Sequence, residues 1–327
     1  MSSQTYRNEF WKYFKLCRQN GKAHFPQMKD FFQTAIELYR DNLNDNPELP
    51  TLISVVKDDL DRVRLLMEHY RRLGVRQFII VDNDSSDGTR EYLAEQEGVR
   101  VYLIKEGFQT RKKEAWIEKV LVLTGFNRWY LVVDSDELID YVGSERHSIV
   151  DLIRAESREG KTCLRGCLLD MYSKHGVFSE DCEYRDIPKS MPFFDRDSYF
   201  EKPPIGMFGG PRYRVFGVEN LVSKQAVFCF KPHMVYRSCH DLLISDSDVR
   251  EGCSYVIRHY KFLKRDWATY IERMKKQNYY NNSIEYKTIM KQIESQGRVS
   301  FAYENSIEYR NSDSLRQLPF LNQIEWN

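Results

Sequence analysis

Hydrophobic runs of strand length alternate with helical patterns through the first half of the chain. Short apolar runs predict buried strands at residues 52–56, 77–81, 99–103 and 129–133. Helical spacing or helix-favouring composition predicts intervening helices over residues 58–73, from residue 89 onward, and over 112–123. Gly74 ends the first of these helices. This alternation predicts an α/β fold with a mostly parallel sheet and flanking helices.

The sequence predicts an extension of this core at each end of the chain. Residues 1–48 predict a helical N-terminal extension, with helical spacing over Phe31 to Tyr39 and a turn-forming stretch after it. Residues 265–278 and 283–296 predict helices within a C-terminal extension, 265–327. The core domain is therefore expected over 49–264, and its segment from Ser179 to Arg214 predicts long irregular loops.

Composition narrows the class of protein. The 327 residues include 49 Lys and Arg and 48 Asp and Glu, so the net charge is only +1. No strong positive electrostatic field is therefore expected to attract nucleic acid. No apolar run approaches the roughly 20 residues of a membrane-spanning helix, and residues 1–15 lack the apolar stretch of a secretory signal. The 7 cysteines are scattered and odd in number, which favours free thiols. We therefore expect a cytoplasmic protein.

The acidic turn Asp134-Ser135-Asp136 directly follows the fourth predicted strand. In an open α/β sheet, ligands bind at the edge formed by the carboxyl ends of the strands. Two carboxylates there suit Mn²⁺ or Mg²⁺, which commonly binds one or two protein carboxylates together with substrate phosphate oxygens. Such a metal stabilises charge on a leaving diphosphate. An Asp-x-Asp sequence also occurs in ordinary surface turns, so the motif alone leaves both interpretations open.

A second acidic turn, Val81 to Thr89, follows the second predicted strand. It is too acidic to cradle phosphates, and its carboxylates suit a base or a ribose. A calcium loop is excluded because Asp87 occupies the place of the required glycine and Leu93 that of the bidentate glutamate. Asp87 is also expected to cap the helix that follows, and this capping is compatible with binding of a base or a ribose by the turn.

Together these motifs resemble the family 2 glycosyltransferases of the GT-A fold, which bind nucleoside-diphospho-sugars. The resemblance runs from about Thr51 to Asp140. It is carried by five motifs: Val55-Val56-Lys57-Asp58, His69-Tyr70, Leu73-Gly74-Val75, Val81 through Thr89, and Arg128-Trp129 through Leu138. It implies a GT-A catalytic domain with a nucleotide-binding half, 49–140, and an acceptor half, 141–264.

The resemblance also implies which residues bind the donor. In this family the end of the first strand and the turn after the second hold the base. The implied donor contacts are Lys57, Asp58, Asp82, Asn83 and Asp134. Many members have Asp-Asp-Gly where this chain has Asp82-Asn83-Asp84, so the usual base-contacting carboxylate falls on Asn83 and the preferred base is open.

The second half resembles the family more loosely, through residues 209–217 and 257–263. A late histidine often joins the aspartates on the metal, which implies Asp134, Asp136 and His259 as ligands. A packed core histidine is the alternative. Arg212, with Arg214, is expected to grip the diphosphate or an anionic acceptor, because guanidinium matches phosphate geometry; structural ion pairs are the alternative.

An inverting transfer needs a carboxylate that takes the proton of the acceptor hydroxyl. We expect Asp195 in this role, with Asp197 and Asp170 as alternatives, and a retaining mechanism would need no such base. Each of these acids could instead serve a turn or a salt bridge.

The expected activity is metal-dependent transfer of a hexose from a nucleotide-sugar donor to a hydroxyl of a glycan or glycolipid. Surface polysaccharide synthesis, with peripheral association at the inner face of a membrane, fits this activity. The alternatives are a nucleotidyl- or phosphotransferase using the same metal site, and a non-catalytic sugar-binding protein. The chain lacks a Walker-type loop and the Asp-Gly-Thr expected after Asp134 in haloacid dehalogenase-like phosphatases, which disfavours the first alternative.

Overall fold

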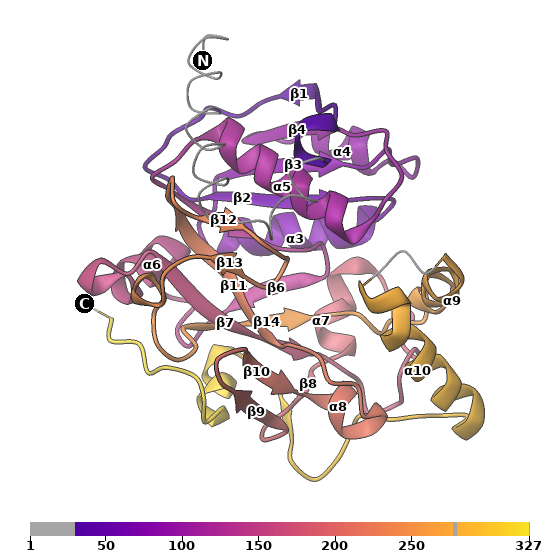
Figure 1. Cartoon of the computed structure of the whole chain (residues 1–327). Coiled ribbons are helices and arrows are strands. Elements are labelled where there is room, and N and C mark those ends of the chain that lie inside the picture. Colours follow the sequence, from indigo (N-terminus) through magenta and orange to yellow (C-terminus); the bar gives the residue numbers. More distant parts are fainter. Residues whose placement is uncertain (1–29, 277–279, 327) are drawn as a thin grey trace.

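A nine-stranded sheet forms the centre of the molecule in the computed structural model, which describes residues 30–276 and 280–326 (Figure 1). The strands lie in the order β1-β4-β3-β2-β5-β11-β7-β14-β6. Their bounds are β1 (Glu37–Asp41), β2 (Thr51–Val56), β3 (Gln77–Asp82), β4 (Val99–Leu103), β5 (Arg128–Val132), β6 (Glu137–Asp140), β7 (Cys163–Asp170), β11 (Ser223–Phe230) and β14 (Tyr255–His259).

The parallel part of the sheet contains β4, β3, β2 and β5, as the alternating pattern predicts. Three helices connect these strands: α3 (Leu60–Arg72), α4 (Thr89–Ala94) and α5 (Thr110–Thr124). Leu52 of β2 packs in one apolar cluster with residues of α3, whereas its neighbour Ile53 packs in a second cluster with residues of α5. Both faces of the strand are therefore buried, which explains its continuous apolar run. The predicted α/β class is confirmed.

The helix predicted through Tyr39 is wrong in its second part. Residues 30–33 are helical, but Glu37–Asp41 forms β1, which pairs antiparallel with β4 at the edge of the sheet. Pairing with β4 satisfies backbone groups that an edge strand would otherwise leave open. A local helical pattern carries no information about such a partner more than 50 residues away. The earlier part of the predicted extension, residues 1–29, lies outside the described residues.

Antiparallel pairs enter the sheet beyond β5. Strand β11 is antiparallel to both β5 and β7, and β14 is parallel to β7 but antiparallel to β6. Helix α6 (Ile149–Glu156) begins with a capping box in which Ser148 and Asp151 exchange hydrogen bonds. The two halves of the chain thus share one continuous sheet.

The region expected as irregular loops contains short ordered elements around this sheet. The short helices and strands there and nearby are α7 (Ile187–Ser190), β8 (Phe193–Asp195), β9 (Tyr199–Lys202), β10 (Gly206–Gly209), α8 (Pro211–Phe216), β12 (Val235–Tyr236) and β13 (Leu242–Leu243). Within the described part of the chain there are also 3₁₀ turns at Arg158–Gly160, Tyr184–Asp186, Asp246–Asp248 and Ser312–Gln317.

The C-terminal part returns to the core. Helices α9 (Asp266–Lys276) and α10 (Tyr280–Gln296), gold in Figure 1, confirm the two helices predicted there. Strand β15 (Ser306–Glu308) then pairs with β8, and the Trp326 ring stacks on His147 with ring centroids 4.1 Å apart.

Two further expectations concern cysteines and membrane spans. The six cysteines within the described residues are free thiols, as the scattered spacing predicted. In the same part of the chain, no helix combines the length and the apolar character that crossing a bilayer requires.

Candidate active site

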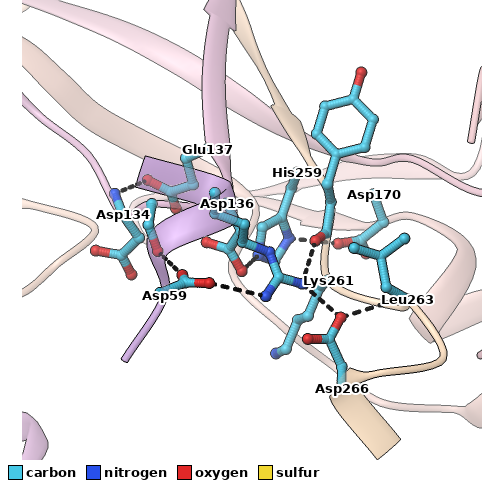
Figure 2. A network of polar contacts seen from close by, with 12 residues as sticks. Asp59, Asp134, Asp136, Glu137, Asp170, His259, Lys261, Leu263 and Asp266 are labelled. Atoms are coloured by element: carbon cyan, nitrogen blue, oxygen red, sulfur yellow. Dashed lines mark hydrogen bonds and ion pairs between the residues drawn. The ribbon is translucent and has the colours of Figure 1, made fainter. Parts of the chain in front are cut away.

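The acidic turn Asp134-Ser135-Asp136, preceded by Val133, joins β5 to the start of β6. The backbone N–H of Asp134 donates to Oε2 of Glu137 at 2.9 Å, which closes the turn. The hydroxyl of Ser135 donates to Oδ2 of Asp59, a residue that follows β2. The turn is therefore fixed at the carboxyl edge of the parallel strands, and its two aspartates turn toward different neighbours (Figure 2).

Asp136 turns toward His259, the last residue of β14. The Nε2 atom of His259 lies 3.4 Å from Oδ2 of Asp136, and its Nδ1–H donates to Oδ1 of Asp170 at 2.8 Å. The strand register produces this row, because β14 places His259 opposite Asp170 of β7 on one side and opposite Glu137 of β6 on the other. Figure 2 shows the histidine between the two carboxylates.

The surrounding charges determine the protonation states of Asp136, His259 and Asp170. Burial alone would raise the pKa of Asp136, but nearby positive groups, His259 first among them, hold it well below its usual value. Burial disfavours the His259 cation, yet Asp136 and Asp170 raise its pKa to about 9. Burial likewise opposes ionisation of Asp170, and Arg212 and His259 outweigh it and lower the pKa to about 2. At neutral pH the histidine is therefore protonated, and a cation bound at Nε2 has to replace that proton.

Asp134 turns away from His259. Its Oδ1 accepts a hydrogen bond from Nζ of Lys113, on α5, at 2.6 Å. A second lysine, Lys224 of β11, donates to Oε2 of Glu137 at 2.5 Å. Burial opposes the charge of Asp134, but the two lysines outweigh it and lower its pKa. Two lysines with little exposed surface thus stand beside the acidic turn.

Lys57 and Asp58, two of the predicted donor-binding residues, tie the end of β2 to the turn after β3. The Nζ of Lys57 donates to the carbonyl oxygen of Asn83 at 2.8 Å. Oδ1 of Asp58 accepts from the backbone N–H of Ser86 at 2.7 Å. Asp58 has a φ of 46°, an uncommon backbone conformation for a residue with a side chain. The structure therefore brings these residues together at one strand edge.

Asp82 and Asn83 differ in how much of their side chains remains available. The side-chain amide of Asn83 donates to the carbonyl oxygens of Ile104 and Glu106, at 3.0 and 2.8 Å. Oδ1 of Asp82 accepts from the backbone N–H of Ser85 at 2.9 Å, whereas its Oδ2 has no hydrogen-bond partner within the described residues. Asp82 is completely buried, so this oxygen is, among the described residues, an unsatisfied acceptor without exposed surface.

Arg212 lies next to the site but does not face an open space. Its Nε donates to Oδ2 of Asp170 at 2.6 Å, and its NH1 donates to Oε1 of Glu285, on α10, at 2.9 Å. The residue is only 4% exposed. These contacts favour the structural alternative, in which Arg212 orients Asp170, over the predicted grip on a diphosphate.

Asp195 is completely buried, and both of its oxygens are engaged. Arg214 donates to the two oxygens, each at 2.9 Å. The hydroxyls of Tyr172 and Ser198 donate to one oxygen each, at 2.8 and 2.6 Å. These contacts favour a structural ion pair between Asp195 and Arg214. They leave neither oxygen of Asp195 free to take a proton from the hydroxyl of an acceptor substrate.

Several residues of the site were not selected from the sequence. They are Asp59, Lys113, Lys224 and Lys261, whose Nζ donates to Glu285 at 2.9 Å. Asp59 had a weak signal, since it directly follows Asp58 at the end of a predicted strand. A lysine within a helix or strand has no comparable signal, because only the packing of distant elements brings it to the turn.

The predicted set of three metal ligands is not assembled in the described residues, where no group of three or more His, Cys, Asp or Glu is arranged to hold an ion. Lys113 holds Asp134 away from the other two. Asp136 and His259 nevertheless fit a shared cation. Their 3.4 Å separation exceeds an ordinary N–H···O hydrogen bond and is close to the about 3 Å between neighbouring ligands of an octahedral ion. Two protein ligands suit a cation that also binds substrate phosphates.

Comparison with known proteins gives weak similarities only. No protein-family model matches the sequence, and no curated protein sequence matches it either. Similar solved structures include the mannosyltransferase PcManGT from Pyrobaculum calidifontis in complex with GDP-Man and Mn²⁺, at TM-score 0.29 and 10% identity over 50% of this chain. Another is glucosyl-3-phosphoglycerate synthase from Mycobacterium tuberculosis in complex with Mn²⁺ and UDP, at TM-score 0.26 and 15% identity over 38% of this chain.

A third similar structure is 4-diphosphocytidyl-2C-methyl-D-erythritol synthase, at TM-score 0.26 and 20% identity, covering 39% of this chain and 63% of that one. This chain spans about half the length of the first two structures, 46% and 44%. Those two are transferases of the class that the sequence motifs resemble. Similarity at these TM-scores carries no argument about activity.

Proposed function

We propose that this chain is a glycosyltransferase that moves a sugar, a hexose by resemblance, from a nucleoside-diphosphate donor to an acceptor hydroxyl with the help of Mn²⁺ or Mg²⁺. One observation carries the proposal: Asp136, in the turn before β6, and His259, the last residue of β14, face each other at 3.4 Å although they are far apart in the sequence. Ligand-binding crevices of open α/β sheets lie at the carboxyl edge of the parallel strands, where this turn is fixed.

Residues in and around the acidic turn would contact different parts of the donor. Asp136 and His259 would hold the cation, which supplies stabilisation of negative charge on the departing diphosphate. Lys113 and Lys224 place two ammonium groups beside the turn, where they would offset phosphate charge. Burial opposes the charge of Asp134, but Lys113, which holds it, lowers its pKa together with Lys224 and keeps it ionised, and it would accept hydroxyl hydrogen bonds from the donor's sugar or ribose.

The nucleotide base is proposed to bind at the ends of β2 and β3. Oδ2 of Asp82 is a buried acceptor without a partner among the described residues. Because Asp82 is completely buried, an N–H group of the base would reach this oxygen only after a local rearrangement of the turn. Lys57 and Asp58 shape the same edge through their contacts with the turn. Asn83 is proposed to act indirectly, since its amide holds the backbone after β4.

The acceptor substrate would bind in the second half of the catalytic domain. We propose the division into a nucleotide-binding half, 49–140, and an acceptor half, 141–264, with a glycan or glycolipid hydroxyl as the acceptor. Surface polysaccharide or glycolipid synthesis at the inner face of a membrane remains the proposed setting. The proposal assigns no proton transfer to Asp195, because Arg214, Tyr172 and Ser198 already occupy its carboxylate.

Donor binding tests the proposal directly. A panel of UDP-, GDP-, dTDP- and CMP-sugars is titrated by calorimetry with Mn²⁺, Mg²⁺ or EDTA, and hydrolysis of each donor is followed in parallel. The test variant is Asp136→Ala. The control is Asp313→Asn, an exposed aspartate whose partner is Arg316 in the C-terminal segment.

Metal-dependent binding and turnover of one donor, lost with EDTA and in Asp136→Ala but kept in the control, is the expected result. Donor binding that ignores both the metal and the substitution would remove the metal site from the proposal. Binding without turnover would favour the sugar-binding alternative, and formation of a nucleotide sugar from a nucleoside triphosphate would favour a nucleotidyltransferase.

A further inference from the structure

Asp170 and His259 are the terminal residues of two neighbouring parallel strands. The register of β7 and β14 sets them directly opposite each other, and Nδ1–H of His259 donates to Oδ1 of Asp170 at 2.8 Å. Asp170 is 1% exposed and His259 is 8% exposed, so water does not compete for this hydrogen bond. The other ring nitrogen, Nε2, points at Asp136. The ring therefore has one nitrogen for Asp170 and one for the candidate cation position.

Arg212 determines which oxygen of Asp170 is left for the histidine. Its Nε–H donates to Oδ2 of Asp170 at 2.6 Å, and its NH1 is held by Glu285 at 2.9 Å. Glu285 also accepts from Lys261 at 2.9 Å, so the carboxylate that anchors Arg212 is itself fixed. With Oδ2 committed to a pure donor, Oδ1 remains an acceptor that faces Nδ1. The hydrogen on the imidazole is thereby kept on Nδ1.

We propose that Asp170 is the positioning residue that keeps the proton of His259 on Nδ1 and so presents the Nε2 lone pair to a divalent cation shared with Asp136. This inference rests on the proposed function, because it needs the cation. Metal-binding histidines generally donate their second ring N–H to a carboxylate, which fixes the ring and its tautomer, and loss of that partner costs about 10- to 100-fold in metal affinity. Asp170 itself touches no substrate in this role.

The substitution Asp170→Asn changes the hydrogen bonding to His259 without changing the size of the side chain. The new side chain keeps the shape of aspartate, but only one of its two ends is an acceptor. Arg212 is a pure donor, so the amide oxygen must face it, and the amide NH₂ must face His259. Nδ1 then accepts, and the ring proton moves to Nε2, where it blocks the cation. A related substitution in the serine protease triad fixes the wrong tautomer in the same way.

The affinity for Mn²⁺ in the presence of a nucleoside diphosphate is measured by electron paramagnetic resonance of the free ion. We expect Asp170→Asn to raise the Kd by about 10- to 100-fold. The matched control is Asp140→Asn, which alters a buried aspartate of β6 that is paired at 2.9 Å with Arg258, the neighbour of His259 in β14, instead of with the histidine itself. The control should lose stability and keep the Mn²⁺ affinity of the wild type.

Nitrogen NMR of the histidine ring gives a second readout that a general loss of stability does not change. In the wild-type protein saturated with Mg²⁺ and nucleoside diphosphate, His259 should carry its proton on Nδ1 alone. In Asp170→Asn the proton should be on Nε2. This wild-type spectrum decides the question even where the variant does not fold, because a proton on Nε2 in the loaded wild type overturns the inference.

The outcomes separate this inference from the proposed function. Wild-type protein that binds no Mn²⁺ with any nucleoside diphosphate would overturn both. Wild-type binding that is unchanged in a folded Asp170→Asn would overturn the positioning role alone and leave the metal site standing. A loss of affinity equal in Asp170→Asn and Asp140→Asn would show a structural effect and also overturn the positioning role.

Discussion

The Nζ atom of Lys113 lies 2.6 Å from Oδ1 of Asp134, so helix α5 contacts the acidic turn that follows β5. The lysine side chain is 12% exposed and that of the aspartate is 36% exposed. Each charge therefore depends on the other more than a surface pair would, although water still reaches the carboxylate.

The substitution Lys113→Met tests this dependence. It removes the cation and leaves Asp134 without its closest partner. Removing one member of a fully buried pair costs about 3–5 kcal/mol, and the partial exposure of Asp134 lowers the expected loss of unfolding free energy to about 1–3 kcal/mol. Urea denaturation measures it. The control is Lys112→Met, because this neighbouring lysine pairs with Glu106 at 3.0 Å with both side chains more than a quarter exposed. Equal losses in the two variants would contradict the prediction.

A second prediction concerns Asp195. Asp195→Asn should lower the unfolding free energy by about 3 kcal/mol, because it leaves the Arg214 guanidinium without its paired charge in a buried site. Turnover of the folded variant should stay within about tenfold of the wild type, since this carboxylate is not free to take a proton. Asp197→Asn, an exposed substitution in the same loop, serves as the control for stability.

A stable Asp195→Asn protein that has lost nearly all turnover would restore the catalytic base that the sequence predicts. Thermal unfolding and initial rates measured on the same preparations distinguish the two outcomes.

Much of the parallel half could be predicted from the sequence. The runs at β2 and β3 are buried on both faces, so their apolar residues are continuous and visible without any partner. The acidic turn was placed correctly at the end of β5 because a turn must follow the strand there. Asp136 lies 3.4 Å from His259, whereas Asp134 faces Lys113.

The rest depends on long-range pairing. The short strand β1 has five exposed residues, so no burial pattern marks it, and only β4 gives it a strand conformation. The contact of Asp170 with His259 comes from the register of two strands separated by more than 80 residues. Arg212 and Asp195 were selected for their chemical type, but whether such a charge faces a ligand or a buried partner is decided by packing that local sequence does not encode.

A third prediction follows from Gly166 in β7, which lies opposite Tyr255 of β14. A Cβ at this position would stand 2.1 Å from the Tyr255 ring, closer than any normal contact. Tyr255 also accepts the backbone N–H of Ala226 through its hydroxyl, at a bulge of β11 close to Lys224. Gly166→Ala should therefore displace the ring and cost about 1–3 kcal/mol or more.

The matched control for Gly166→Ala is Gly107→Ala. A Cβ there would have no atom of the described residues within 4 Å, so this variant should unfold at nearly the wild-type denaturant concentration. Gly166→Ala should also weaken donor binding, because the bulge that moves with Tyr255 carries Lys224. A Gly166→Ala protein as stable as the control would show that the sheet absorbs the methyl group.

The fourth prediction uses the pH dependence of stability. His69, on α3, is 4% exposed and lies 2.7 Å from the carbonyl oxygen of Ile139 through Nε2. Burial, and then the charge of Arg258, lowers its pKa to about 3. In the unfolded chain the pKa of a histidine is about 6.5, so between these values the unfolded state binds more protons than the folded state. Stability should therefore fall as pH drops below about 6.5, by up to about 1.4 kcal/mol per pH unit from this group.

His69→Gln separates this contribution from the other acid-sensitive groups. A glutamine can donate to the Ile139 carbonyl through its amide but does not titrate. The variant loses some packing at every pH, so the informative quantity is the difference between the two unfolding free energies as a function of pH. That difference should be constant above about pH 7 and should shrink steadily toward pH 4, because only the wild type has a histidine that the unfolded state protonates. A difference that stays constant over the whole range would mean that His69 accepts a proton in the folded protein as easily as in the unfolded chain, which its buried contact with Ile139 argues against.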